Sequence, residues 1–197
     1  MRDALPRALR EDAHRWAAGK WWQWRALLLA LLAYTGVRHV ADPEYASIFS
    51  GITLAIHEIG HLLFAPLGEW MAVAGGSIAQ VAAPIAVAAL LARQRDYFGV
   101  AVGGAWLSFS LCGMAAYIAD ARAQSLPLVS VGEGPVVHDW EYLLEHAGLL
   151  RSDALIARLA VTVAVAVLAA SVAWGAWVCA QMRKGTGRSP AIRSTAR

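Results

Sequence analysis

Charged residues are scarce in this sequence, and that scarcity limits the kinds of protein it can be. Only 16% of the 197 residues are Asp, Glu, Lys or Arg, whereas 58% are hydrophobic. Soluble domains contain about 25% charged and about 45–50% apolar residues. The composition therefore argues against an ordinary soluble domain and favours a chain whose main solvent is lipid.

Cysteine is nearly absent as well. Cys112 and Cys179 both stand in apolar segments, and they lack the close spacing of a Cys-x-x-Cys metal motif. We expect both to be core residues. A cleavable signal peptide is also not expected, because the polar and basic residues 1–20 come before the first apolar run and no small-residue cleavage site follows it.

Long apolar runs, by contrast, are abundant. A helix needs roughly 20 predominantly apolar residues to cross a bilayer. Runs of about this length recur along the chain, at residues 22–39, 47–66, 71–92, 98–119 and 154–181. The sequence therefore predicts an all-α, polytopic integral membrane helix bundle with about five membrane segments, embedded in a lipid bilayer.

The polar remainder predicts a simple division of the chain. Residues 1–20 are expected to form a short interfacial helix, and the tryptophans that follow are of the kind that gather at membrane interfaces. Residues 21–181 are expected to form one membrane-embedded domain, which includes a polar loop at 120–153. Residues 182–197 form a basic C-terminal tail.

The charge distribution makes a prediction about topology. The net charge of +3 is concentrated at the two ends of the chain, and basic flanks usually mark the cytoplasmic face and contact anionic lipid. We expect a plasma membrane protein, such as one of a bacterial inner membrane, with a cytoplasmic N-terminus. Five full crossings, our default, would place the basic C-terminal tail on the opposite face. If 71–92 is re-entrant instead, both tails share one face.

Nucleic acid is not an expected partner. The basic ends carry no aromatic platform and no folded motif that would read bases. We interpret them as solvated segments beside the membrane.

One predicted membrane segment carries ionisable side chains near its centre. His57 and His61 are four residues apart, so a helix places both imidazoles on one face, where they could bind a single metal ion. In zinc hydrolases with this pattern, the glutamate takes a proton from the metal-bound water. The motif therefore predicts a Zn²⁺ site with His57 and His61 as ligands and Glu58 as the general base.

The membrane context strengthens this prediction. A charged side chain near the centre of a membrane helix costs roughly 2.5–3.5 kcal/mol, so ionisable groups placed this close together need a partner. A shared metal ion would satisfy both histidines. The alternative is a pair of packing histidines that are hydrogen-bonded to neighbouring helices, with Glu58 protonated.

A catalytic zinc ion usually has three protein ligands, so one more must come from elsewhere. We expect His138 or Asp139, or both, to complete the site at the start of a short helix predicted at Trp140 to Leu149. The alternatives are that Asp139 only caps this helix and that His138 is an exposed loop residue. Gln80 could hydrogen-bond a metal ligand or a substrate backbone, or form a plain interhelical hydrogen bond. The weaker candidates in the polar loop are Glu141, Glu145 and His146.

The motif segment also carries a family resemblance. From His57 to Phe64 the chain reads His-Glu-Ile-Gly-His-Leu-Leu-Phe, and a glycine-bearing stretch follows. This segment resembles the site-2 protease family of intramembrane zinc metalloproteases. The resemblance implies that His57 and His61 bind zinc, that Glu58 is the base, and that an aspartate on a later helix is the third ligand. The Asp-Gly motif of that family is absent, so Asp139 corresponds to the family's third ligand only in its expected role. His138 is the other candidate for that role.

These observations predict an intramembrane zinc metalloprotease that hydrolyses peptide bonds in or near membrane-spanning segments of a membrane-protein substrate. The alternative is a zinc-binding membrane protein without proteolytic activity, such as a transporter, a sensor or a scaffold. A transporter would need polar residues in several spans, and apart from Gln80 the other spans offer few.

Overall fold

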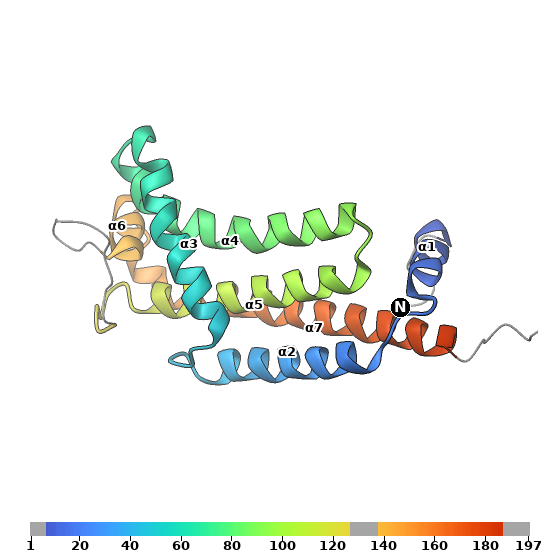
Figure 1. Cartoon of the computed structure of the whole chain (residues 1–197). Helices are drawn as coiled ribbons and strands as arrows, with labels where there is room; N and C mark the ends of the chain where they lie inside the picture. Colours follow the sequence, from blue (N-terminus) through green and yellow to red (C-terminus); the bar gives the residue numbers. More distant parts are fainter. Residues whose placement is uncertain (1–6, 127–137, 187–197) are drawn as a thin grey trace, which may run out of the picture.

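Every regular element in the described part of the chain is a helix. The computed structural model describes residues 7–126 and 138–186 (Figure 1). The elements are α1 (Arg7–Ala17), α2 (Gln23–Ala41), α3 (Ile48–Phe64), η2 (Ala65–Leu67), α4 (Glu69–Arg93), α5 (Tyr97–Ala119), α6 (Asp139–His146), η3 (Leu150–Ser152) and α7 (Asp153–Thr186). The predicted all-α fold is confirmed. The middle of the polar loop, at 127–137, and most of the basic tail lie outside the described residues.

Local chemistry sets several of the helix boundaries. A capping box starts α3, in which the backbone N–H of Ser47 donates to Oγ of Ser50 at 3.0 Å. Asp96 starts α5 and accepts from the backbone N–H of Gly99 at 3.0 Å. Gly68 ends the α3 and η2 segment with a φ of 101°, a conformation that favours glycine.

Four described helices are long and apolar enough to cross a membrane, namely Ile48–Leu67, Glu69–Arg93, Tyr97–Ala119 and Leu150–Gly185. The chain is therefore a membrane helix bundle. The fifth predicted span, 22–39, corresponds to α2, which is not among these four. Its 19 residues include Arg25, Arg38 and His39, which lower its hydropathy.

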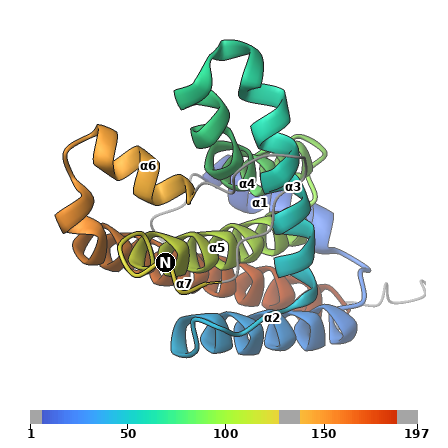
Figure 2. The same ribbon diagram turned by 90° about the vertical axis from the view of Figure 1, so that its left-hand side faces the viewer.

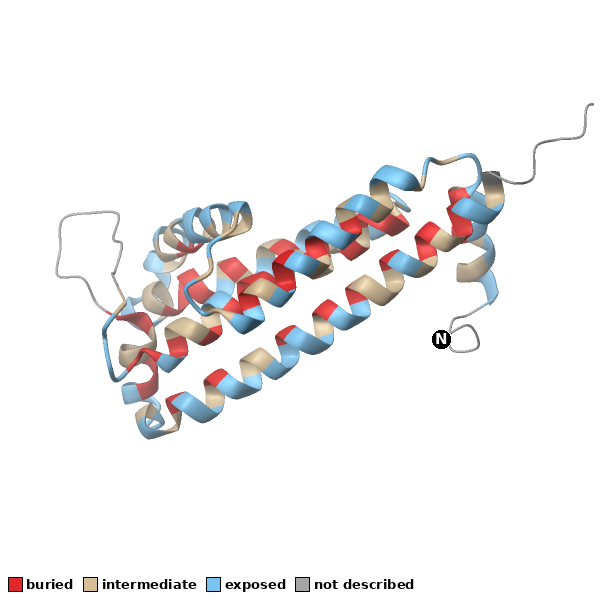
Figure 3. Cartoon of the chain, turned by 90° about the horizontal axis from the view of Figure 1, so that it is seen from below, coloured by how far each residue is buried: buried red, intermediate tan, exposed pale blue. Residues whose placement is uncertain are grey.

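The helix α5 is the centre of the bundle. It packs against α4 and α7, and 56% of its candidate span is buried. Buried positions run as stripes along the long helices, and the remaining positions face outward (Figure 3). The predicted core residues Cys112 and Cys179 are buried free cysteines.

The motif helix α3 has a different direction from its neighbours. The helices α2, α5 and α7 run along the bundle, whereas α3 runs steeply across one end of it (Figures 1 and 2). The first turns of α4 run back beside α3, and its later turns run along α5 (Figure 2). Only 11% of the candidate span at Ile48–Leu67 is buried.

The basic segments of the described chain lie together at the other end of the bundle (Figure 1). The helix α1 packs on the last turns of α7, where Ala17 and Met182 share one core cluster. The turn between α4 and α5 joins them, because Arg95 Nη1 lies 2.9 Å from Asp12 Oδ1 and the Tyr97 hydroxyl donates to Asp12.

Among the predicted membrane segments, α3, and not the segment 71–92 of the re-entrant alternative, is the one that does not run along the bundle (Figures 1 and 2). Ionisable groups near the middle of α3 offer a physical reason, because at the end of the bundle polar partners can reach them.

Glycines bring α3 and α4 into backbone contact. A methyl group added at Gly60 would overlap the carbonyl oxygen of Gly75, and one added at Gly75 would lie 2.6 Å from the carbonyl oxygen of Gly60. Small residues allow membrane helices to approach this closely. The contact places the glycine and glutamine side of α4 against the histidine face of α3.

We predict that Gly60→Ala lowers the free energy of unfolding by about 1–3 kcal/mol, because overpacking forces the two backbones apart. Thermal unfolding in detergent measures the change. The control is Gly51→Ala in the same helix, where an added methyl group meets nothing within 4 Å. This control should be neutral or stabilising by up to about 1 kcal/mol. Equal stability of Gly60→Ala and wild type would show that the two backbones are not in contact.

Candidate metal centre

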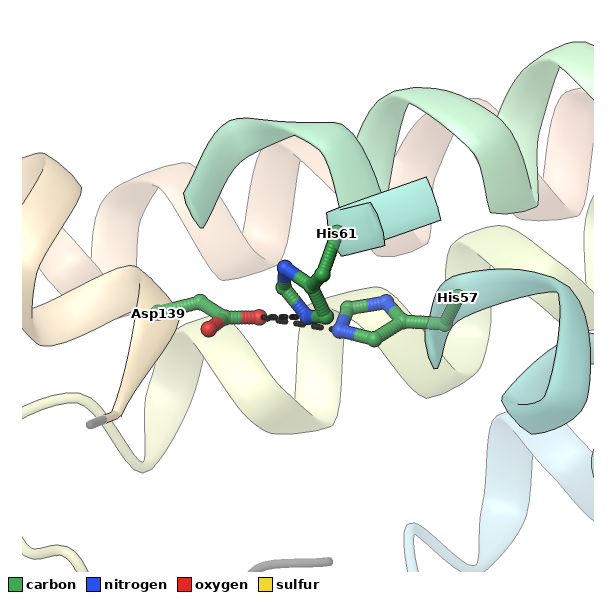
Figure 4. A group of neighbouring side chains, drawn as sticks. All are labelled: His57, His61 and Asp139. Carbon is green, nitrogen blue, oxygen red and sulfur yellow. Dashed lines mark hydrogen bonds and ion pairs between the residues drawn. The ribbon is translucent and has the colours of Figure 1, made fainter. Parts of the chain in front are cut away.

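Three side chains from α3 and α6 meet at one point (Figure 4). Nε2 of His57 lies 2.9 Å from Oδ2 of Asp139, and Nε2 of His61 lies 3.3 Å from the same oxygen. His57 and Asp139 are buried, and His61 is partly buried. The ligand atoms of all three lie within 4.8 Å of one another, so the group could hold a metal ion.

The spacing on α3 and a glycine on α4 create the room for this group. His57 and His61 are one helical turn apart, and their ring centroids are 4.7 Å from each other. A methyl group added at Gly76 would lie 2.5 Å from Nε2 of His57 and 2.6 Å from Nε2 of His61. Only glycine at this position leaves both nitrogens uncovered.

The outer nitrogens of both rings have fixed partners. Nδ1 of His57 lies 2.7 Å from Oε1 of Gln80, and Nε2 of Gln80 donates to the carbonyl of Ser110 at 3.1 Å. With its amide nitrogen donating to a carbonyl, Gln80 presents its oxygen as an acceptor to His57. Nδ1 of His61 lies 2.8 Å from the carbonyl of Ala72, which can only accept. Both Nδ1 atoms therefore carry a proton.

The inner nitrogens, Nε2 of both rings, face Asp139, where each can either donate a proton to the carboxylate or offer a lone pair to a metal ion. Burial raises the pKa of Asp139, but its hydrogen bonds with His57 and His61 outweigh burial and hold the pKa below its ordinary value. The carboxyl group is thus ionised. A buried carboxylate needs a positive charge beside it, which either protonated imidazoles or a metal ion bound by all three residues would supply.

The structure places His138 outside this group, although it is buried rather than exposed. Its Nδ1 accepts a hydrogen bond from the backbone N–H of Glu141 at 3.2 Å, and its Nε2 faces Oδ2 of Asp120 at 3.4 Å. That second pair is close but not hydrogen-bonded, since Nε2 of His138 has no hydrogen-bond partner among the described residues. The prediction that Asp139 caps α6 is wrong, because His138 is the cap and Asp139 is the first helical residue.

Glu58 lies beside the group on α3 and is partly buried. The weaker candidates of α6 are not part of the three-residue group found in the described chain. They are Glu141, Glu145 and His146.

Sequence reasoning missed Tyr117 and Asp120. The Tyr117 hydroxyl accepts from the backbone N–H of Asp139 at 3.1 Å, and its ring centroid lies 4.2 Å from that of His138. Burial raises the pKa of Asp120, but hydrogen bonds from Ser125 and the backbone N–H of Leu126 outweigh it and lower the pKa. The sequence did offer one signal for them, because Tyr117 and Asp120 are polar residues three positions apart at the end of an apolar segment.

We predict that Asp139→Ala weakens metal affinity by more than about 100-fold, because it removes a ligand rather than an outer partner, whose loss costs about 10–100-fold. Metal analysis of the purified protein, with chelator competition, measures the loss. His138→Ala is the neighbouring control, and it should keep its metal while losing about 0.5–2 kcal/mol of stability with the helix cap. Full metal binding in Asp139→Ala, or its loss in His138→Ala, would contradict the ligand set.

Comparisons of the chain with models of known protein families, with curated proteins and with solved structures find no match. The chemistry of the site is therefore inferred from the geometry around His57, His61 and Asp139.

Proposed function

We propose that this protein is a zinc-dependent endopeptidase that hydrolyses peptide bonds in or near membrane-spanning segments of other proteins. The proposal rests on the convergence of His57, His61 and Asp139, and on Glu58, which lies on the same helix as the two histidines. The resemblance of the motif segment to site-2 proteases supports the same reaction.

The donor set and its spacing favour zinc as the metal. Bonds from zinc to nitrogen and oxygen are about 2.0–2.2 Å long, so two ligand atoms of a tetrahedral ion lie about 3.3–3.5 Å apart. The distance from Nε2 of His61 to Oδ2 of Asp139, 3.3 Å, agrees with this value, and the distance from Nε2 of His57 to the same oxygen, 2.9 Å, is shorter by about 0.4 Å. Magnesium and calcium prefer oxygen ligands, which the two imidazoles do not supply.

The residues of the chain divide the chemical work. Bound zinc lowers the pKa of a coordinated water towards about 7 and polarises a carbonyl group. Glu58 takes a proton from the attacking water while the water oxygen bonds to the peptide carbon. Glu58 then donates this proton to the leaving nitrogen as the C–N bond breaks. Gln80 and the Ala72 carbonyl hold the two imidazoles in place through their Nδ1 atoms.

The surface around the motif suits a substrate that arrives from lipid. Ile59, Leu62 and Leu63 of α3 flank the histidines in sequence, and their side chains are 60%, 62% and 69% exposed. A membrane-spanning segment of another protein would find an apolar contact surface beside the candidate centre. Because α3 crosses one end of the bundle, we expect the cleaved bond near a membrane boundary (Figure 1).

We predict that Glu58→Gln abolishes hydrolysis but retains the metal, because general acid–base catalysis contributes about 10²–10⁴-fold to a rate. Wild type and variant are expressed in cells, and the new N-termini of membrane proteins are compared by mass spectrometry. Termini in or near membrane segments should appear with wild type and fall at least about 100-fold with the variant.

The matched control is Glu44→Gln, the same substitution in an exposed turn, which should leave the termini unchanged. Metal analysis shows whether the Glu58→Gln site is intact. If both variants give the same termini as wild type while metal stays bound, the chain is a metal-binding membrane protein without proteolytic activity.

A further inference from the structure

A polar cavity lies at the end of the bundle where α1 packs on the last turns of α7 (Figure 1). Its volume is about 180 Å³, and it is lined by Arg10, His14, Trp177, Gln181 and Lys184. A water molecule occupies about 30 Å³ of liquid, so the cavity has room for a small polar group. The proposed hydrolysis makes no use of it.

The lining is cationic. Arg10 of α1 and Lys184 of α7 bring positive charges from two different helices, and no carboxylate is among the lining residues. Guanidinium and ammonium groups both bind phosphate oxygens. His14 adds an imidazole, whose ring centroid lies 6.3 Å from that of Trp177.

A buried amide also lines this cavity. Gln181 is only 5% exposed, and its Oε1 atom has no hydrogen-bond partner among the described residues. An unsatisfied buried polar atom is costly and usually has a partner outside the chain, such as water, an ion or a ligand. A ligand hydroxyl group would supply the missing donor.

Tryptophans and cations gather at the same end of the bundle as the cavity, in the way that is typical of a membrane interface. Trp174 and Trp177 stack with their ring centroids 5.2 Å apart. Lys20 Nζ lies 4.7 Å from the ring centroid of Trp16, and the guanidinium carbon of Arg25 lies 4.1 Å from that of Trp24. These contacts place this end of the bundle at the level of the lipid headgroups.

The geometry points to a binding site for the headgroup of an anionic phospholipid, with its phosphate between Arg10 and Lys184 and a headgroup hydroxyl at Gln181. Phosphatidylglycerol carries both groups. Basic flanks favour the cytoplasmic leaflet, where anionic lipids attract them. A bound headgroup would bridge α1 and α7 and fasten the N-terminal helix to the bundle. This inference is independent of the proposed hydrolysis.

Native mass spectrometry of the full chain in detergent, titrated with phosphatidylglycerol or phosphatidylcholine, tests the site. We expect one tightly bound phosphatidylglycerol and markedly weaker binding of phosphatidylcholine. Arg10→Gln and Lys184→Gln should each weaken phosphatidylglycerol binding about tenfold, because each removes a charge-assisted hydrogen bond. Gln181→Leu should weaken it severalfold without any change of charge.

The control variant carries Arg151→Gln in η3 and Arg158→Gln at the start of α7, which remove positive charges from the other end of the bundle. An equal weakening in this control would show a diffuse charge effect and overturn the site. Equal binding of phosphatidylcholine would overturn its preference for anions. Displacement of the lipid by millimolar inorganic phosphate would show a site for free phosphate instead.

Thermal unfolding of each variant is recorded in parallel. If Lys184→Gln lowers stability but leaves lipid binding unchanged, Lys184 only interacts with the carbonyl groups at the end of α7, and the inference fails.

Discussion

The convergence of His57, His61 and the Asp139 carboxylate on one point is the constraint on which the arrangement of this end of the protein depends. Gln80 and the Ala72 carbonyl hold the Nδ1 atoms of His57 and His61, so both Nε2 atoms face the Asp139 carboxylate. A carboxylate in a poorly solvated place needs a positive charge beside it, which a metal ion or protonated imidazoles would supply. Gly76 keeps the space open, and the contact between Gly60 and Gly75 holds α4 close enough to supply the outer partners.

The same constraint helps to explain the unusual course of α3. A helix with ionisable side chains near its middle is expensive to place at the centre of a bilayer. At one end of the bundle, α6 brings it a polar partner, Asp139, whose backbone N–H donates to the Tyr117 hydroxyl of α5. Because α3 does not run along the bundle, the basic segments of the described chain come to lie together at the other end (Figure 1). The metal group and the basic cavity therefore occupy opposite ends.

The sequence was sufficient to predict the features that depend on local pattern. The lengths of the apolar runs located α4, α5 and α7, and the four-residue spacing of His57 and His61 placed them on one face. Asp139 was one of two neighbouring candidates, and the choice between them needed the packing of α6, since Asp139 is 82 positions from His57. The direction of α3, the cap at His138 and the role of Tyr117 depend on contacts between distant helices, for which a single sequence carries little signal.

The metal centre itself can be tested most directly by X-ray absorption spectroscopy of the purified protein. We expect one bound metal ion with a first shell of nitrogen and oxygen atoms only, at about 2.0–2.1 Å if the ion is zinc. The outer scattering should show two imidazole rings. A protein that retains no metal, or a first shell that contains sulfur or lacks imidazole, would contradict a centre built from His57, His61 and Asp139.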